Sequence, residues 1–452
     1  ALPIFSGSAM PDFHPSPGAA NGGRSVTAQP YDGRLLGDWL HRLRPPLETI
    51  SLGGMGIAGG ADMAHFFNAT RSPRSALYAA RRLLRHGWQR LRAGRGQHLV
   101  NGNALVARLL RSALDAGVCF QLNAPVVRLL QGPPGVSGAV LRSDSGEIHV
   151  EAGAVVLACG GFPHDRQRLA QVVPHAAEGY GHFSAAPPDN QGEGIRLGES
   201  VGGQFDTSLR HPLAWAPVSR VTLASGQQLM FPHLVERAKP GVIAVLPNGK
   251  RFVNEADSYH DFIAALLAAT PAGDTPQAWL LADRRALRRY GLGHARPFPF
   301  TPTAWLRTGY LQRGNTLAEL AKQCAIDANT LAETVQRFNH FASAGEDVDF
   351  HRGASAYNRA QGEHQVTLGP LREGPFYAVR ILPGSLGTFS GLQTDEHARV
   401  LDEQQQPIPG LYAIGNDMSS VMRGYYPSGG ITLGPAMTFG YLVGKNLAKK
   451  QI

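Results

Sequence analysis

Apolar runs that end in glycine constrain the fold of this chain most strongly. Residues 154–158 read AVVLA and precede CGG, and residues 410–414 read GLYAI and precede GN. Because the first run shows no polar alternation, we expect a buried strand inside a sheet that is covered on both faces. A third glycine cluster, GTFSGL, occupies residues 387–392. Such glycines usually form turns, but three clusters in one chain favour a dinucleotide held at the carboxyl edge of an α/β sheet.

The remaining pattern predicts mixed helices and strands. The first fifty residues read as loops and short strands. An Asn-Gly turn at 101–102 is expected next, followed by a helix that carries Leu105, Leu109, Leu110 and Leu114 and ends at Gly117. A β-meander is expected over 119–158, with a turn at 144–146. From residue 216 the sequence pattern changes to mixed strands and helices, with helix N-caps at Thr316 and Asp327. This change indicates a second, inserted domain. A strand over 410–414 and a closing helix complete the chain.

Length and composition favour a globular protein of two or three domains. The chain has 452 residues, of which 43% are hydrophobic, so it can bury a large core. Its longest apolar stretches, 154–159 and 431–442, fall short of the ~18 residues of a membrane span. We expect no signal peptide. Cys119, Cys159 and Cys324 are an odd number without metal-like spacing, so we expect buried thiols, no metal and a cytoplasmic location.

Positive charge is concentrated in one segment. Lysine and arginine number 43 against 34 acidic residues, a net charge of +9, and arginines crowd residues 71–95 among Leu77, Leu84, Trp88 and Leu91. The segment is either an amphipathic helix that touches a membrane surface or an acidic partner, or a packed helix with a solvated arginine face. Nucleic acid is not expected as a partner, because no binding motif or aromatic-interleaved basic strand accompanies the charge.

Seven motifs follow one another along the chain: LVNGNALVARL, VVLACGGF, DNQGEGIRLGESVGG, NGKRFVNEADSYHDF, LGTFSGLQTDEHARVL, GLYAIGN and YYPSGGITLGPAMTFGY. Together they resemble one known superfamily, the flavin-dependent fumarate reductases and 3-ketosteroid dehydrogenases, and the second branch more closely. The resemblance implies an α/β fold with an α+β insert and FAD in a cleft. A Rossmann-like FAD-binding domain, residues 1–215 and 388–452, would be interrupted by a substrate domain, residues 216–387.

The same resemblance implies a set of residues that bind FAD. They are Gly160, Gly161, Asn190, Gly192, Gly194, Gly387, Gly415, Asn416, Gly429, Ile431, Thr432 and Leu433. One departure concerns the Gly-x-Gly-x-x-Gly turn and downstream acid that grip the FAD phosphates and ribose in this family. The chain contains neither, and its nearest match, SLGGMGIAGGADMAHF at 51–66, has no apolar strand before it.

The substrate class follows from one position of the motif at 248–262. Fumarate reductases place a proton-donating arginine a few residues beyond the Asn-Glu pair, whereas this chain has Tyr259, as the ketosteroid dehydrogenases do. Loss of a permanent cation argues against a carboxylate substrate. The resemblance implies that Tyr259 is the base that removes a proton beside a ketone. It also implies that the Tyr426 hydroxyl and the Gly430 N–H bind the ketone oxygen.

A second tyrosine supports the base in this family, and its nearest match here is Phe13. Tyr31, Tyr425, His14 or His260 could replace it, or the base is weaker. By residue type alone, His14, His211 and His260 are more typical of surface or capping positions. Arg423 could bind a carboxylate and supports the fumarate-reductase interpretation.

Three hypotheses result. The first is an FAD-dependent 3-ketosteroid dehydrogenase, forming either the Δ1 or the Δ4(5α) double bond, or desaturating a non-steroidal enone. The second is a flavin enzyme that reduces an activated alkene in a small acid. The third is a truncated or non-catalytic chain that binds no FAD.

Overall fold

The computed structural model describes residues 5–179 and 181–449, and its contacts divide the chain into two units. Unit 1 comprises Ala1–Phe120, Ser219–Asp257 and Ala278–Ile381. Unit 2 comprises Gln121–Val218, Ser258–Gln277 and Leu382–Ile452. Two long strands run from one unit into the other, β10 (Leu213–Thr222) and β15 (Phe376–Thr388).

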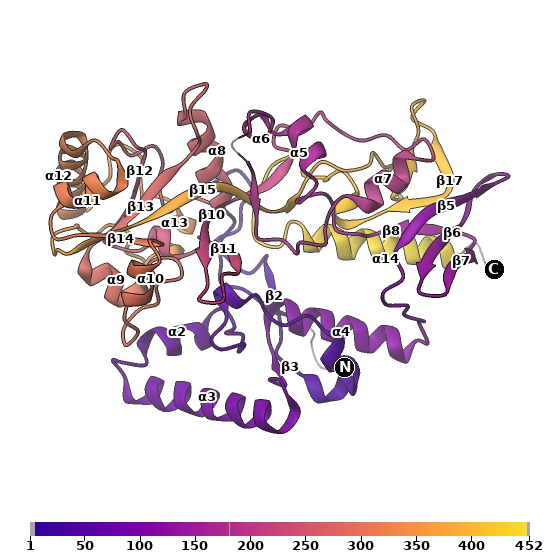
Figure 1. The fold of residues 1–452 in the computed structure, drawn as a ribbon, viewed down its shortest axis with the longest axis horizontal. Helices are drawn as coiled ribbons and strands as arrows, with labels where there is room; N and C mark the ends of the chain where they lie inside the picture. The colour runs from indigo at the N-terminus through magenta and orange to yellow at the C-terminus, as the bar shows by residue number, and fades with distance from the viewer. Residues whose placement is uncertain (1–4, 180, 450–452) are drawn as a thin grey trace. The chain divides into compact units, whose positions relative to one another are not determined.

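Unit 1 begins with short elements and two long helices. Its elements before residue 121 are β1 (Phe5–Gly7), β2 (Val26–Ala28), β3 (Tyr31–Asp32), η1 (Gly33–Leu36), α1 (Trp39–Arg42), η2 (Glu48–Ile50), α2 (Ala61–Asn68), α3 (Pro73–Ala93), β4 (His98–Leu99) and α4 (Asn101–Asp115). Figure 1 shows α3 lying alongside α2, and Leu36, Leu40 and Leu99 form a small core with the inner face of α4.

An antiparallel sheet forms the larger core of unit 1. The later elements of this unit are β11 (Gln228–Pro232), η3 (Glu236–Ala238), β12 (Val242–Val245), β13 (Ala278–Ala282), α9 (Arg284–Tyr290), α10 (Thr303–Arg307), β14 (Leu311–Gly314), α11 (Leu317–Cys324), α12 (Ala328–Ala344) and α13 (Ala356–Gln361). Strand β13 pairs with β12, and β15 pairs with both β13 and β14. Helices α11 and α12 pack on this sheet through Leu320, Leu331 and Phe338. Figure 1 shows both helices beside β12 and β13.

Unit 2 contains two three-stranded sheets. Its elements are β5 (Val126–Gly132), β6 (Gly135–Ser143), β7 (Gly146–Glu151), β8 (Val155–Leu157), α5 (Arg166–Val172), α6 (Pro174–Ala177), β9 (Phe183–Ser184), α7 (Glu193–Glu199), α8 (Tyr259–Ala269), β16 (Arg399–Leu401), β17 (Pro407–Ala413), η4 (Gly415–Asp417) and α14 (Leu433–Lys449). β5, β6 and β7 form the meander, and β17 joins β16 to β8, with which it runs parallel. Helix α14 packs on β17 through Val443 and Tyr412.

Several predicted elements are confirmed. The predicted helix is α4, which ends at Asp115, two residues before Gly117, and the turn at 144–146 joins β6 to β7. The Asn-Gly pair at 101–102, predicted as a turn, is instead the start of this helix. The side chain of Thr316 caps α11 by accepting the Glu319 N–H, and Asp327 caps α12 by accepting the Thr330 N–H. The predicted strand at 410–414 corresponds to β17, which ends at Ala413.

Three expectations are wrong in detail. The first strand of the meander begins at Val126 rather than at 119. Strand β8 is not covered on both faces, because it is at the edge of its sheet within the described residues and Val156 is 37% exposed. Cys324 is a buried thiol as expected, but Cys119 and Cys159 are exposed, since both lie outside helices and strands.

The predicted domain boundaries stay a prediction. The contacts group residues 1–120 with much of the predicted insert, whereas the sequence pattern assigned them to the FAD-binding domain. In the part of the chain that the structure describes, no helix has the length and apolar content needed to cross a membrane.

Candidate active site

Tyr259 is the first residue of helix α8 in unit 2, and a cap fixes its position. The Ser258 hydroxyl accepts the Asp261 N–H at 3.1 Å and donates to the Asp261 carboxylate at 2.7 Å. Ser258 is fully buried, so this cap is shielded from water. The cap therefore fixes the start of helix α8 at Tyr259, whose side chain projects from the first turn.

Tyr426 contacts Tyr259 in unit 2. The Tyr259 hydroxyl donates to Tyr426 Oη at 2.7 Å, and the two rings meet edge to face with centroids 5.1 Å apart. Tyr426 is 4% exposed. Burial raises the pKa of Tyr426, and the hydrogen bond from Tyr259 offsets part of that rise. Tyr426 therefore keeps its proton at neutral pH and remains a hydrogen-bond donor.

Gly430 and the start of helix α14 supply backbone donors. Gly430 has a φ of 89°, a left-handed conformation that glycine adopts without strain. Its carbonyl accepts the Gly434 N–H at 2.7 Å. Within the described residues, the Gly430 N–H has no backbone acceptor. Such a group suits a ketone oxygen or another electron-rich atom.

Two histidines and a phenylalanine surround the phenol pair. His260 Nδ1 accepts the Trp215 N–H at 3.2 Å, which leaves the proton of the neutral ring on Nε2. The His260 ring lies 5.6 Å from that of Tyr426 and 5.8 Å from that of Phe389. His260 is 2% exposed, so the expectation of a surface position is wrong. His211 is half-buried against His260, and desolvation lowers its pKa.

The glycine clusters of the predicted cofactor site meet around one carboxylate. Asp417 accepts the backbone N–H groups of Cys159 at 2.5 Å and Gly161 at 2.9 Å. A Cβ at Gly194 would lie 2.2 Å from Asp417 Oδ2, so glycine is required there. Burial raises the pKa of Asp417, although both N–H groups counteract it. Sequence reasoning missed this residue, for which the only signal was its place directly after Gly415 and Asn416.

The other predicted cofactor residues lie in the same unit. A Cβ at Gly160 would meet Asn190 Nδ2 at 2.7 Å, and a Cβ at Gly387 would meet Asn416 Nδ2 at 2.6 Å. The Gly192 N–H donates to the Gly161 carbonyl at 3.0 Å. Gly429 directly precedes Gly430 and is exposed. At Gly160, Gly194 and Gly387 the structure therefore brings predicted residues together where a side chain would not fit.

A narrow crevice runs beside the start of α14. Gly415 and Asn416 line it on one side, and Ile431 and Thr432 on the other. These residues fit a flavin ring chemically, because they present glycine backbone and the free N–H groups of a helix N-terminus. The crevice has a volume of about 10 Å³.

The residues considered as support for Tyr259 are placed differently. Tyr425 is 52% exposed and its hydroxyl accepts from Arg210 Nη1 at 3.4 Å. Tyr31 and His14 belong to unit 1, as does Phe13, whose ring packs on that of Tyr357 at 4.5 Å. In unit 2, Tyr426 itself is the hydroxyl partner of Tyr259.

Arg423 is paired with an acidic side chain of the protein. It forms an ion pair of 2.9 Å with Asp206, which also accepts from the hydroxyl groups of Ser208 and Ser419. Burial acts to raise the pKa of Asp206, but these donors and Arg423 outweigh it, so the pKa is lowered. A carboxylate substrate would have to compete with this acid for Arg423.

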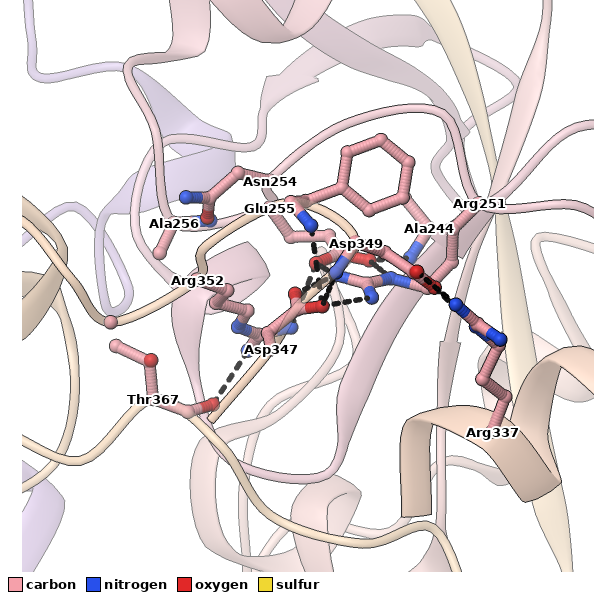
Figure 2. A network of polar contacts seen from close by, with 12 residues as sticks. Ala244, Arg251, Asn254, Glu255, Ala256, Arg337, Asp347, Asp349, Arg352 and Thr367 are labelled. Carbon is pink, nitrogen blue, oxygen red and sulfur yellow. Dashed lines mark hydrogen bonds and ion pairs between the residues drawn. The ribbon is translucent and has the colours of Figure 1, made fainter. Parts of the chain in front are cut away.

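The segment before Tyr259 is anchored in unit 1 by a buried ionic network, which Figure 2 shows. Glu255 accepts from Arg251 at 2.7 Å and from Arg352 at 3.0 Å, and Arg251 also pairs with Asp347 at 2.8 Å. Burial acts to raise the pKa of Glu255. The charges of Arg251 and Arg352 outweigh this effect and lower the pKa to about 2. The Asn-Glu pair of the motif is therefore structural in this unit.

The glycine-rich stretch at 51–66 forms no nucleotide turn. Leu52 and Met55 exchange both backbone hydrogen bonds around Gly53 and Gly54, which makes a tight two-residue turn. Helix α2 follows from Gly60, and the element directly before the turn is the 3-10 helix η2 rather than a strand.

Comparison with known proteins decides the family. The model of the FAD binding domain family matches residues 7–433. The chain belongs to this FAD-binding family.

Relatives in the family are dehydrogenases. The chain is 39% identical to 4-oxocyclohex-2-ene-1-carboxylate 5-dehydrogenase of Sinomonas cyclohexanicum, over 97% of this chain and 75% of the relative. It is 34% identical to 3-oxosteroid 1-dehydrogenase of Mycolicibacterium smegmatis, over 97% of this chain and 77% of the relative. The crystal structure of 3-ketosteroid Δ1-dehydrogenase from Sterolibacterium denitrificans matches at a TM-score of 0.88 and 34% identity, over 99% and 81% of the two chains. The family, its FAD cofactor and its oxidoreductase class agree with the resemblance in the sequence.

Proposed function

We propose that this protein is an FAD-dependent dehydrogenase that introduces a carbon–carbon double bond beside a ring ketone, with a 3-ketosteroid as substrate and the Δ1 bond as product. The observation that carries the proposal is the 2.7 Å contact between Tyr259 and Tyr426 in unit 2. Relatives that are 3-oxosteroid 1-dehydrogenases support the Δ1 position.

The chemistry requires two neighbouring groups. Removing a proton from the carbon beside a ketone needs a base, and the ketone oxygen needs donors because negative charge grows on it. Since that oxygen and that hydrogen belong to adjacent carbons, the base and the donor have to be close together. The paired hydroxyls of Tyr259 and Tyr426 meet this requirement.

Burial assigns the two roles. Tyr426 is buried with a raised pKa, so it retains the proton that it would donate to the ketone oxygen. The free N–H of Gly430, four residues later, would be the second donor. Tyr259 is more exposed than Tyr426, and its own proton can reach solvent before it acts as the base.

The Tyr426 proton can serve only one acceptor at a time. In the structure Tyr259 donates to Tyr426 Oη, so this contact does not use the Tyr426 proton. Once Tyr259 has lost its proton, it can no longer donate to Tyr426. Bound FAD supplies the hydride acceptor for the neighbouring carbon. Gly415, Asn416 and the start of α14 would hold the flavin ring.

The first prediction concerns these phenols. Adding 4-androstene-3,17-dione to the flavin-loaded protein without oxygen should bleach the flavin absorbance. Tyr259→Phe should slow bleaching about 10²- to 10⁴-fold through loss of the base. Tyr426→Phe should slow it about 10²- to 10³-fold through loss of an oxyanion donor. The product's mass and NMR spectrum locate the new double bond.

Tyr425→Phe is the matched control, because it removes an adjacent hydroxyl that contacts Arg210 instead. Its bleaching rate should equal that of the wild type. Full bleaching in both active-site variants would contradict the assigned roles, and protein that takes up no FAD would contradict the proposed function.

A second candidate substrate is a ring ketone that carries a carboxylate. The relative at 39% identity acts, by its name, on such a compound. In unit 2, Arg210 contacts Tyr425, the neighbour of Tyr426, and has no acidic partner within the described residues. This cation is the observation that favours the second candidate.

We also propose that α3 rests on an anionic membrane surface. The helix turns its polar side inward, where Arg82 and Tyr78 contact Asp62 at 3.0 and 2.9 Å. On its outer side, the exposed fraction is 74% for Leu84, 57% for Trp88 and 86% for Leu91. Residues 73–93 include six arginines and no acid. An apolar stripe flanked only by cations suits anionic lipid.

The second prediction tests this surface. The protein should sediment with phosphatidylcholine vesicles that contain phosphatidylglycerol and not with phosphatidylcholine alone. The double variant Leu84→Ser/Trp88→Ser should lose that binding. Val366→Ser, which changes an exposed apolar residue elsewhere in unit 1, should not. A dimer that the double variant disrupts, without vesicle binding, would replace the membrane with a second copy of the chain.

A further inference from the structure

Unit 1 contains a cavity of about 610 Å³ that the proposed chemistry does not use. Its walls come from the turn at 52–55, the end of α3, the start of α4 and the loop at 294–296. Gly53 and Gly54 both have positive φ angles, of 58° and 81°, which a tight turn at this wall requires. All of these segments belong to one compact unit.

Three arginines face the cavity without an acidic partner. Arg90 donates to the Gly53 carbonyl at 3.1 Å, and Arg296 donates to the Ser51 carbonyl at 2.8 Å. Arg95 donates to two carbonyls, those of Leu40 and Leu43, at 2.5 and 2.6 Å. Among the described residues, none of these arginines forms an ion pair, whereas Arg82 nearby pairs with Asp62.

Unpaired cations at a partly buried wall are costly. Burial lowers the pKa values of Arg95 and Arg296, because desolvation disfavours the charged form. A guanidinium has five N–H donors, so each arginine retains donors beyond those that its carbonyl contacts use. Of the residues that line the cavity, one is acidic, the exposed Glu48. Three cations against one anion leave a formal charge of +2 at this wall.

His294 adds a second, independent indication of a ligand. It lines the cavity and is 7% exposed, and neither ring nitrogen has a hydrogen-bond partner in the described part of the chain. Buried polar groups almost always have a partner. The His294 ring meets the Trp305 ring edge to face, with centroids 4.6 Å apart. The backbone N–H of His294 donates to Tyr310 Oη at 2.9 Å. Desolvation lowers its pKa to about 4, so the neutral ring offers one N–H donor.

The rest of the wall is apolar. Met55, Leu99 and Val100 are all buried and line the cavity beside the arginines. We propose that this cavity binds a small organic anion, whose carboxylate or phosphate group meets Arg90, Arg296 and His294 while its apolar part packs on Met55, Leu99 and Val100. The proposal does not rest on the flavin chemistry, because it concerns binding alone.

Calorimetry on the 452-residue chain at low salt tests the proposal with three probes. Hexyl phosphate and hexanoate share an apolar tail and differ in the anionic group, and hexanol has the tail without charge. At least one of the two anions should bind with a stoichiometry of one, and hexanol should not. Affinity should fall as salt is added. The anion that binds more tightly shows whether the cavity prefers a phosphate or a carboxylate group.

Variants on one helix supply the control. Arg90→Gln should weaken binding about tenfold, whereas Arg92→Gln, whose guanidinium lies over the Trp88 ring outside the cavity lining, should leave it unchanged. His294→Phe preserves the edge-on packing against Trp305 and should weaken binding several-fold. Binding of neither anion would overturn the proposal, as would equal losses in Arg90→Gln and Arg92→Gln. Binding that survives both Arg90→Gln and His294→Phe would place the anion elsewhere and overturn it too.

Discussion

Arg210 separates the two proposed substrate classes. Its guanidinium lies 5.7 Å from the centroid of the Tyr425 ring, and a Cβ at Gly424 would meet the Arg210 backbone nitrogen at 3.2 Å. The arginine is therefore held next to the segment that carries Tyr426. Arg423, which the sequence offered as the carboxylate ligand, is instead paired with Asp206. Of the two cations, Arg210 is the one that can meet a substrate carboxylate without displacing an acid.

The third prediction follows from this charge. Arg210→Gln should lower kcat/KM for 4-oxocyclohexanecarboxylate by about 10- to 100-fold, the cost of losing a charge-assisted hydrogen bond. It should leave kcat/KM for 4-androstene-3,17-dione unchanged, because that ketone carries no charge. The methyl ester of the cyclohexane substrate is the matched control and should be insensitive to the substitution. Equal losses on all three compounds would exclude a carboxylate-binding role for Arg210.

The residues of the site differ in how far the sequence could predict them. Tyr259, Tyr426 and Gly430 each belong to a motif, so the sequence could name them before their distances were known. Asp417 was missed because its partners, the N–H groups of Cys159 and Gly161, are more than 250 positions away along the chain. His260 was assigned to the surface because residue type alone does not report burial.

The cap of helix α8 leads to the fourth prediction. Ser258→Ala removes the acceptor of the Asp261 N–H and should cost about 1 kcal/mol of unfolding free energy. Because Tyr259 is the first residue of this helix, fraying of the first turn should also slow flavin bleaching several-fold. Urea unfolding and anaerobic bleaching measure the two effects separately.

Thr316→Ala is the matched control for this cap. Thr316 accepts the Glu319 N–H at the start of α11, a helix in unit 1 that carries no proposed catalytic residue. Its loss should cost a similar unfolding free energy and leave bleaching unchanged. A bleaching rate that is equal in both variants would show that the Ser258 cap does not position Tyr259.

Elements were predicted better than their orientation. Helical spacing identified α3, but its outward stripe of leucines depends on Asp62, a residue of α2 that draws Arg82 and Tyr78 inward. The apolar run of β8 predicts a strand covered on both faces, yet Val156 is exposed. Within the described residues β8 lies at the edge of its sheet, and an edge position is decided by the pairing of distant strands rather than by the run itself. Periodicity reports which residues share a face, and packing partners decide where that face points.

At the scale of the whole molecule, the fold of unit 1 depends on charges that come together from distant segments. Glu255, Asp347 and Arg352 span almost a hundred positions, and their side chains are fully shielded from solvent. Arg352 also donates to the carbonyls of Val242 and Thr367, which ties β12 to the chain after α13. The sequence motif at 248–262 contains Arg251 and Glu255, but it could not predict this network, since nothing local links residue 255 to residue 352.

The fifth prediction tests the network. Glu255→Gln leaves the Arg352 charge buried without its partner, which should lower the unfolding free energy by about 3–5 kcal/mol at pH 7. Arg337→Gln breaks the more exposed pair with Asp349, drawn in the same view in Figure 2, and should cost about 0–1 kcal/mol. Urea unfolding curves measure both. A loss below 1 kcal/mol in Glu255→Gln would contradict a stabilising role for the network.

The same glutamate gives stability a defined dependence on pH. The pKa of Glu255 is lowered to about 2 in the folded protein, against ~4.3 in an unfolded chain. A lowered folded-state pKa means that its contribution is complete above the unfolded value and is lost as pH falls from there towards about 2. The unfolding free energy of the wild type should therefore drop more steeply over this range than that of Glu255→Gln. Because both proteins share every other titrating group, the difference between their curves isolates Glu255, and parallel curves would show that its carboxylate is not held by Arg251 and Arg352.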